Sequence, residues 1–237
     1  MKRRVAVRQY KVPFLPPKRI EDEAQLLLDE WAESHSAVIE PPVPLDDILE
    51  FHLGLAFYMA DLQTDLGHPD VLGGIWFGDK TIKVDKSLDP SIQPKLLGRY
   101  RFTLAHEVGH WRLHRQHLME DPSAKSLFEA NCEPAFIQRS CASEPEEVQA
   151  NAFASCVLMP HQMVYDAWSA WRGSHNPVAI SELSIGSYHA DRQANEDMAM
   201  DKFCKPLAER FEVSAEAMRY RLQKLELLVK KVHPRLF

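Results

Sequence analysis

Residues 99–114 read RYRFTLAHEVGHWRLH and contain a His-Glu-x-x-His motif. The stretch has no proline and only one glycine, so we predict a helix over residues 99–118. Two residues four positions apart lie on the same face of a helix, about 6 Å apart along its axis. The imidazoles of His106 and His110 can therefore converge on one metal ion.

Glu107 belongs to the same motif but is suited to a different role. It is badly placed to bind the ion together with His106 and His110, yet close enough to act on a water molecule at the metal. We therefore predict a Zn²⁺ site, with Mn²⁺ as the alternative, and Glu107 as the general base. Chance alone produces this motif in roughly one sequence of this composition in 25, so the motif by itself is not decisive. A third protein ligand must come from elsewhere in the chain.

His114 is not that third ligand. It follows His106 by eight residues, which is about 12 Å along an unbroken helix. A longer motif, in which a glycine turns the chain back to a third histidine, also fails because Leu113 and Gln116 stand at those positions. We expect His114 to be packed in the core or to support a ligand, rather than to contact substrate.

A carboxylate on a second helix is the better candidate. Residues 147–159 read EVQANAFASCVLM, and we predict a helix over residues 146–159 that Pro160 ends. Glu147 and Asn151 share one face of it, so Glu147 could supply a metal oxygen and Asn151 a hydrogen bond to a ligating imidazole. Glu144 and Glu146 are the alternatives, although charged side chains in a first helical turn need no metal to explain them.

The rest of the chain predicts several shorter elements. We expect an amphipathic helix over residues 20–36, a short helix over 45–55, a β-hairpin over 71–84, an irregular segment over 119–144 and a helical region over 202–231. These elements divide into a metal-binding domain with an N-terminal helix, residues 1–195, and a helical C-terminal segment, residues 196–237.

The two motifs together resemble the ImmA/IrrE family of metallo-endopeptidases. The resemblance is carried by RYRFTLAHEVGH at residues 99–110, by EVQANAFASCVLMP at 147–160, and by the segment from Val213 to Leu222. It extends over most of residues 40–228. One departure is Gln149, where many members carry glutamate.

This resemblance implies an α+β, zincin-like core with a small antiparallel sheet and a helical C-terminal segment. The hairpin at residues 72–85 would form the edge strand above the metal helix, where an extended substrate could add a strand. The implied activity is that of a gluzincin-like endopeptidase that cleaves a helix-turn-helix repressor and so relieves transcriptional repression. The residue that stabilises the oxyanion stays open among His161, Tyr165, Tyr188 and His189.

A DNA-binding regulator with a non-hydrolytic peptidase-like domain is the competing interpretation. Residues 207–225 have the pattern of a helix, a short turn and a second helix, with Ser214 as the N-cap. Arg219, Arg221 and Lys224 could contact phosphates. We favour a helical hairpin that packs on the core instead, because basic residues are few and the formal net charge is −6.

The sequence predicts a cytoplasmic protein. The basic N-terminus is interrupted by prolines and no apolar segment of a signal peptide follows it. No run of apolar residues is long enough to span a membrane. The four cysteines form no C-x-x-C pair, as expected for reduced thiols. We expect a protein substrate and no membrane partner, and the sequence gives no indication of oligomeric state.

Overall fold

The computed structural model describes residues 12–139, 144–183 and 191–229. The chain forms two compact units, residues 1–38 with 43–158 and residues 39–42 with 159–237. The predicted α+β class is confirmed, since the first unit combines helices with a four-stranded sheet.

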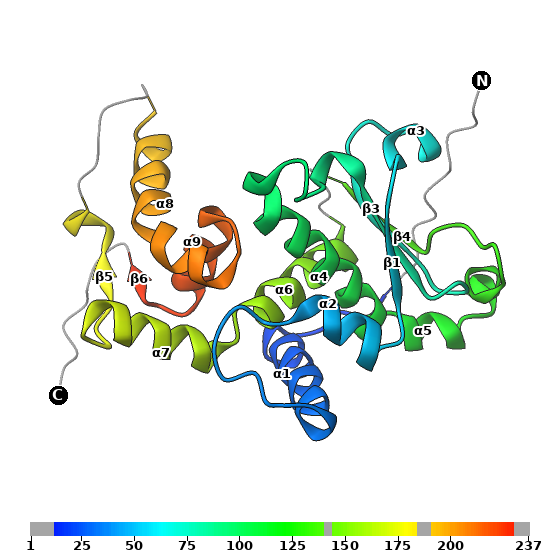
Figure 1. Cartoon of the computed structure of the whole chain (residues 1–237), viewed down its shortest axis with the longest axis horizontal. Coiled ribbons are helices and arrows are strands. Elements are labelled where there is room, and N and C mark those ends of the chain that lie inside the picture. The colour runs from blue at the N-terminus through cyan, green and yellow to red at the C-terminus, as the bar shows by residue number, and fades with distance from the viewer. Residues whose placement is uncertain (1–11, 140–143, 184–190, 230–237) are drawn as a thin grey trace. The chain divides into compact units, whose positions relative to one another are not determined.

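The sheet has the strand order β1-β3-β2-β4 (Figure 1). Its strands are β1 (Ala56–Ala60), β2 (Val71–Trp76), β3 (Thr81–Asp85) and β4 (Phe136–Arg139). The β2-β3 hairpin confirms the prediction, and β2 also runs antiparallel to β4. The sheet is nevertheless mixed rather than antiparallel, because β1 pairs in parallel with β3. Helix α3 (Leu62–Leu66) connects β1 to β2, and these two strands are not neighbours in the sheet. Strand β3 follows β2 in the sequence and lies between β1 and β2.

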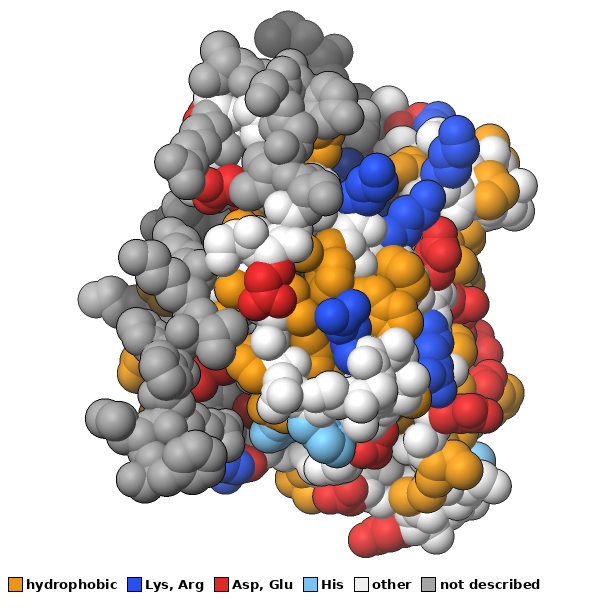
Figure 2. All heavy atoms as spheres, turned by 90° about the vertical axis from the view of Figure 1, so that its left-hand side faces the viewer, with side chains coloured by type: hydrophobic (Ala, Val, Ile, Leu, Met, Phe, Trp, Pro, Cys, Tyr) orange, Lys and Arg blue, Asp and Glu red, His pale blue; other side chains and the backbone are white. Residues whose placement is uncertain are grey.

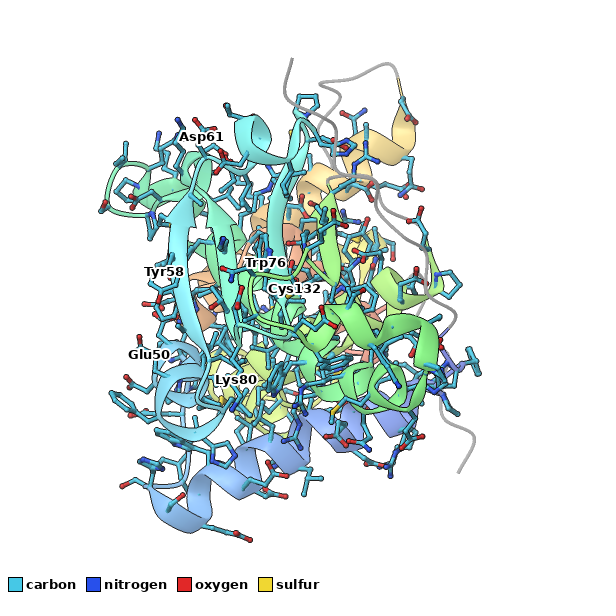
Figure 3. All side chains as sticks on the ribbon, turned by 90° about the vertical axis from the view of Figure 1, so that its right-hand side faces the viewer. Glu50, Tyr58, Asp61, Trp76, Lys80 and Cys132 are labelled. Atoms are coloured by element: carbon cyan, nitrogen blue, oxygen red, sulfur yellow. The ribbon has the colours of Figure 1, made fainter. Side chains whose placement is uncertain are left out.

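The prediction that the hairpin forms the sheet edge is wrong. Both hairpin strands lie inside the sheet, and β1 and β4 are its outer strands. Strand β4 comes from the segment expected to be irregular, which also contains α5 (Arg115–Glu120) and the 3-10 helix η4 (Pro122–Phe128). Four residues are too few to show a strand alternation in the sequence. Ile137 on β4 packs in one cluster with Trp76, and Cys132 packs against this cluster. Figure 3 shows Trp76 and Cys132 near each other.

The long helices of the first unit lie on the other face, whereas the short helix α3 contributes Leu62 and Leu66 to the cluster around Trp76. Helix α4 (Leu97–Leu113) lies against β2, β3 and β4 and packs on α6 (Pro145–Leu158), which in turn packs on α1 (Pro17–Ser34). Helix α4 ends earlier than predicted, and α5 begins after His114. Shorter helical turns complete the unit: α2 (Leu45–Asp47), the π-helix η1 (Ile48–His52), and the 3-10 turns η2 (Lys86–Leu88) and η3 (Pro94–Leu96).

The second unit is mainly helical. It contains α7 (His161–Arg172), which was not predicted, η5 (Ile180–Glu182), α8 (Arg192–Phe211) and α9 (Ala215–Lys224). Strands β5 (Val178–Ala179) and β6 (Leu228–Val229) form a small parallel pair. The predicted N-cap is confirmed, because the Ser214 hydroxyl accepts a hydrogen bond from the Ala217 amide at 3.0 Å. Within the described ranges, no helix has the length and apolar character that crossing a membrane requires.

Candidate metal centre

The two motif histidines lie side by side on α4. Their Nε2 atoms are 3.0 Å apart, and both side chains are fully buried. Burial lowers the pKa of His110 to about 4, so this imidazole is neutral at neutral pH. Neutral imidazole is the form that binds Zn²⁺ and similar ions.

Glu147, in the first turn of α6, supplies a third donor group. Its Oε2 lies 3.1 Å from His106 Nε2 and its Oε1 lies 3.2 Å from His110 Nε2. Burial opposes the ionisation of Glu147, but its contacts with the two histidines outweigh burial, so that its pKa is lowered. The side chain is therefore a carboxylate at neutral pH, although it is almost completely buried.

Close packing of α6 on α4 brings these groups together. Gly109 faces Ala150, and a Cβ at Gly109 would lie 3.1 Å from Ala150 Cα and 3.3 Å from Phe153 Cβ. A larger residue would hold the two helices further apart. The glycine inside the His-Glu-x-x-His motif thus sets the distance between the histidines of one helix and the carboxylate of the other.

Asn151 fixes the protonation of one histidine. Its Oδ1 lies 2.9 Å from His106 Nδ1, and an amide oxygen can only accept a hydrogen bond, so Nδ1 carries the proton. The lone pair of His106 Nε2 then faces the Glu147 carboxylate. This arrangement is repulsive unless a proton or a metal cation lies between them, so the donor set fits a bound metal.

The spacing of the donors also fits a tetrahedral ion. Zn²⁺ with bonds of about 2.0–2.1 Å holds its ligand atoms about 3.3 Å apart, and here the separations are 3.0 to 3.2 Å. His106, His110 and Glu147 are all buried, with ligand atoms within 4.8 Å of one another. Three protein ligands leave one position free, as catalytic zinc sites do.

Glu107 lies beside this cluster as a buried acid. Its side chain is fully buried, and neither carboxylate oxygen has a hydrogen-bond partner within the described part of the chain. Burial and the nearby Glu147 raise the pKa of Glu107 well above its usual value. An unpaired carboxyl group of this kind is suited to taking up a proton.

Two residues that shape the site were not predicted from the sequence. A Cβ at Gly73 on β2 would lie 2.6 Å from Thr103 Cγ2 and 3.0 Å from Glu107 Oε1, so glycine leaves room for the Glu107 carboxyl group. The Phe136 ring on β4 stacks on the His110 ring, with centroids 4.0 Å apart and planes 10° apart. The Gly73-Gly74 pair could have suggested a close backbone approach, but nothing in the sequence pairs Phe136 with His110.

The structure separates the remaining sequence candidates from the cluster. Neither Glu144 nor Glu146 belongs to the group of possible metal ligands within the described residues. His114 is fully buried, and its Nδ1 lies 3.0 Å from His110 Nδ1, so the expectation of a packed histidine is confirmed. Of the oxyanion candidates, Tyr165 donates its hydroxyl proton to the Leu225 carbonyl at 3.1 Å. His161 is exposed, and Tyr188 and His189 lie outside the described residues.

Two of the three proposed phosphate contacts are wrong. Arg219 is 5% exposed, with Nε 2.7 Å from Asp201 and one terminal nitrogen 3.1 Å from Asp197. Arg221 is 1% exposed and donates from Nε to the Met159 carbonyl at 2.9 Å. Their guanidinium groups are thus used inside the second unit. On the face shown in Figure 2, the described lysines and arginines are interspersed with acidic and hydrophobic side chains.

Comparison with known proteins identifies the family of this chain. A family described as the IrrE N-terminal-like domain, Peptidase_M78, matches residues 95–223. No curated protein matches the sequence significantly. Among solved structures, a Mycobacterium tuberculosis transcriptional regulator is similar, with a TM-score of 0.43 and 17% identity over 92% of this chain and 49% of that chain. This chain therefore spans about half the length of that protein. Because the family match covers more than half of its residues and includes both motifs, the chain belongs to the peptidase-like family of IrrE N-terminal-like domains.

Proposed function

We propose that the protein is a cytoplasmic, metal-dependent endopeptidase that holds Zn²⁺ with His106, His110 and Glu147. The observation that carries this proposal is the convergence of three buried donor atoms, 3.0 to 3.2 Å apart, beside an unpaired buried acid. A purely structural metal site has no need for such an acid, because structural zinc is enclosed by four protein ligands.

When bound, the metal would supply Lewis-acid activation of water and of the substrate carbonyl. Glu107 would take a proton from the attacking water on one carboxylate oxygen and pass it to the leaving amine nitrogen. Its raised pKa favours the first transfer, because a more basic carboxylate holds the proton better. Water would add across the peptide bond, so that one carboxyl group and one amine are released.

The substrate we propose is a helix-turn-helix transcriptional repressor, whose cleavage would relieve repression. Family membership supports this substrate class. We also propose that the scissile segment binds in extended form along β4, the outer strand of the sheet that contacts the metal helix through Phe136. Pairing with a sheet edge presents the main chain of a peptide in a regular, extended form.

The decisive experiment compares the wild-type protein with Glu107→Gln and His110→Ala. The zinc-loaded proteins would be incubated with repressors encoded beside their gene, and fragments would be detected by mass spectrometry. We expect Glu107→Gln to bind zinc without cleaving, and His110→Ala to lose zinc. Cleavage by Glu107→Gln at the wild-type rate would refute the base, and equal zinc content in His110→Ala would refute the metal site.

A further inference from the structure

Gln149 forms a buried contact that links α6 to the N-terminal segment. It is 4% exposed, and its Nε2 donates to the Pro13 carbonyl oxygen at 3.1 Å. A carbonyl oxygen can only accept, so this contact fixes which end of the amide carries the NH₂ group. The Gln149 Oε1 atom must therefore be directed away from Pro13.

The atom that complements Oε1 is the outer nitrogen of His114. Gln149 Oε1 and His114 Nε2 are both buried, and neither atom has a hydrogen-bond partner within the described residues. A hydrogen bond from His114 Nε2 to Gln149 Oε1 would satisfy both atoms, and Gln149 acts on the His114 side chain as an acceptor. With this bond, His114 carries its proton on Nε2 and has a lone pair on Nδ1.

The direction of the remaining contact follows. His114 Nδ1 lies 3.0 Å from His110 Nδ1, and two nitrogen atoms at this distance share one proton. Since His114 Nδ1 accepts, His110 Nδ1 must donate. The Nε2 atom of His110, which faces His106 and Glu147, then keeps its lone pair. If His114 Nδ1 donated to His110 Nδ1 instead, the proton of His110 would be on Nε2. That nitrogen could then not bind a metal ion.

We propose that Pro13, Gln149 and His114 form a directional hydrogen-bond chain that sets the tautomer and ring orientation of His110. His114 and Gln149 are thus positioning residues, and the main chain at Pro13 belongs functionally to the metal centre. This inference rests on the metal site proposed above. It also means that the two histidines are oriented differently: His106 directly by Asn151 on α6, and His110 through a chain that ends at the N-terminal segment.

Two matched pairs of variants test the chain. In His114→Asn the side-chain oxygen can occupy the place of Nδ1 and accept from His110, whereas His114→Leu has similar size and no acceptor. Gln149→Glu keeps an acceptor for His114 Nε2 and loses only the donor to the Pro13 carbonyl, whereas Gln149→Leu loses both. Each full-length protein would be titrated with Zn²⁺ against a chromophoric chelator. The histidine nitrogens of the metal-free proteins would be observed by ¹⁵N NMR.

We expect His114→Leu to weaken zinc binding about 10- to 100-fold, the usual effect of losing a partner of a ligating histidine. Gln149→Leu should have a smaller effect in the same direction, and the Asn and Glu variants should recover most of the affinity. In the wild-type protein, NMR should show protonated Nε2 on His114 and protonated Nδ1 on His110. If His114→Leu fails to fold, the Gln149 pair and the wild-type spectrum still decide the question.

A proton on His114 Nδ1 in the wild-type spectrum would overturn the proposal. So would equal zinc affinities within both pairs of variants. These results differ from failure of the proposed function, because the tautomers are read without metal or substrate. Loss of zinc binding in His110→Ala, together with indifference to His114 and Gln149, would leave the metal site standing and remove only the chain.

Discussion

Replacing Gly109 with alanine would separate the stability of the fold from the geometry of the metal centre. The added Cβ would lie 3.1 Å from Ala150 Cα and 3.2 Å from the Ala150 carbonyl oxygen. Comfortable contacts between carbon atoms are about 3.5 to 4.0 Å. Both neighbours belong to the backbone of α6, so a side-chain rotation cannot relieve the contact and the helix itself must move.

The displacement is small for the fold but large for a metal. Helix α6 would retreat by about 0.5 Å to restore normal contacts, and it would carry Glu147 with it. Metal–ligand distances in well-formed sites hold to about 0.2 Å. Overpacking costs about 1 to 3 kcal/mol, and the better helix propensity of alanine offsets about 1 kcal/mol of that. We therefore expect a loss of stability below about 2 kcal/mol and zinc binding weakened about 10-fold or more, which corresponds to at least about 1.4 kcal/mol.

The assay combines thermal unfolding of the metal-free protein with competitive zinc titration. Gly98→Ala is the matched control, because Gly98 lies in the first turn of the same helix and is only partly buried. That variant should keep its zinc affinity and gain slightly in stability. If Gly109→Ala bound zinc as tightly as the wild-type protein, the distance between α4 and α6 would not govern the site.

Three further predictions concern other contacts. Asn151→Leu should weaken zinc binding about 10- to 100-fold, because His106 loses its acceptor. Asn151→Asp keeps an acceptor and should bind zinc nearly normally. Equal zinc affinities of the two variants in the titration would contradict the role of Asn151. Hydrogen bonds from Arg112 lower the pKa of Glu30, so this pair stabilises the fold above about pH 4.3, the unfolded value, and loses its effect as pH falls through the folded pKa. Glu30→Gln should therefore lower the free energy of unfolding by about 1 to 2 kcal/mol at pH 7 and by little near pH 3. Urea unfolding that shows the same loss of stability at both pH values would refute this. Ser214→Ala should cost about 1 kcal/mol by removal of the N-cap, and Ser214→Asp should not, as urea midpoints would show.

Elements governed by local sequence were the most predictable. The α4 and α6 helices follow from stretches that no proline interrupts, and Pro160 restricts the residue before it so that α6 ends at Leu158. The i, i+4 pairs within the helices, His106 with His110 and Glu147 with Asn151, also follow from helix geometry. That the two pairs meet was indicated by the family resemblance, because spacing along a chain does not show which faces of two helices pack together.

Elements that depend on distant partners were not predictable. Strand β4 has only four residues and is recognisable through its pairing with β2, far away in sequence. Arg219 and Arg221 look like surface cations in the sequence, but acidic side chains of α8 and a main-chain carbonyl bind them in the interior. An arginine can be buried when its charge and donors are satisfied, and the sequence does not name those partners.

Gln149 shows how such a partner changes the meaning of a residue. In the sequence it is a departure from the glutamate of many family members, and a carboxylate could accept from His114 equally well. The structure places a main-chain carbonyl, that of Pro13, on the other side of the residue, where a carboxylate would bring two acceptors together. An amide satisfies both neighbours because it accepts at one end and donates at the other. The choice of glutamine is therefore explained by the N-terminal segment rather than by the metal. It follows that a family member with glutamate at this position needs a donor where this chain has the Pro13 carbonyl.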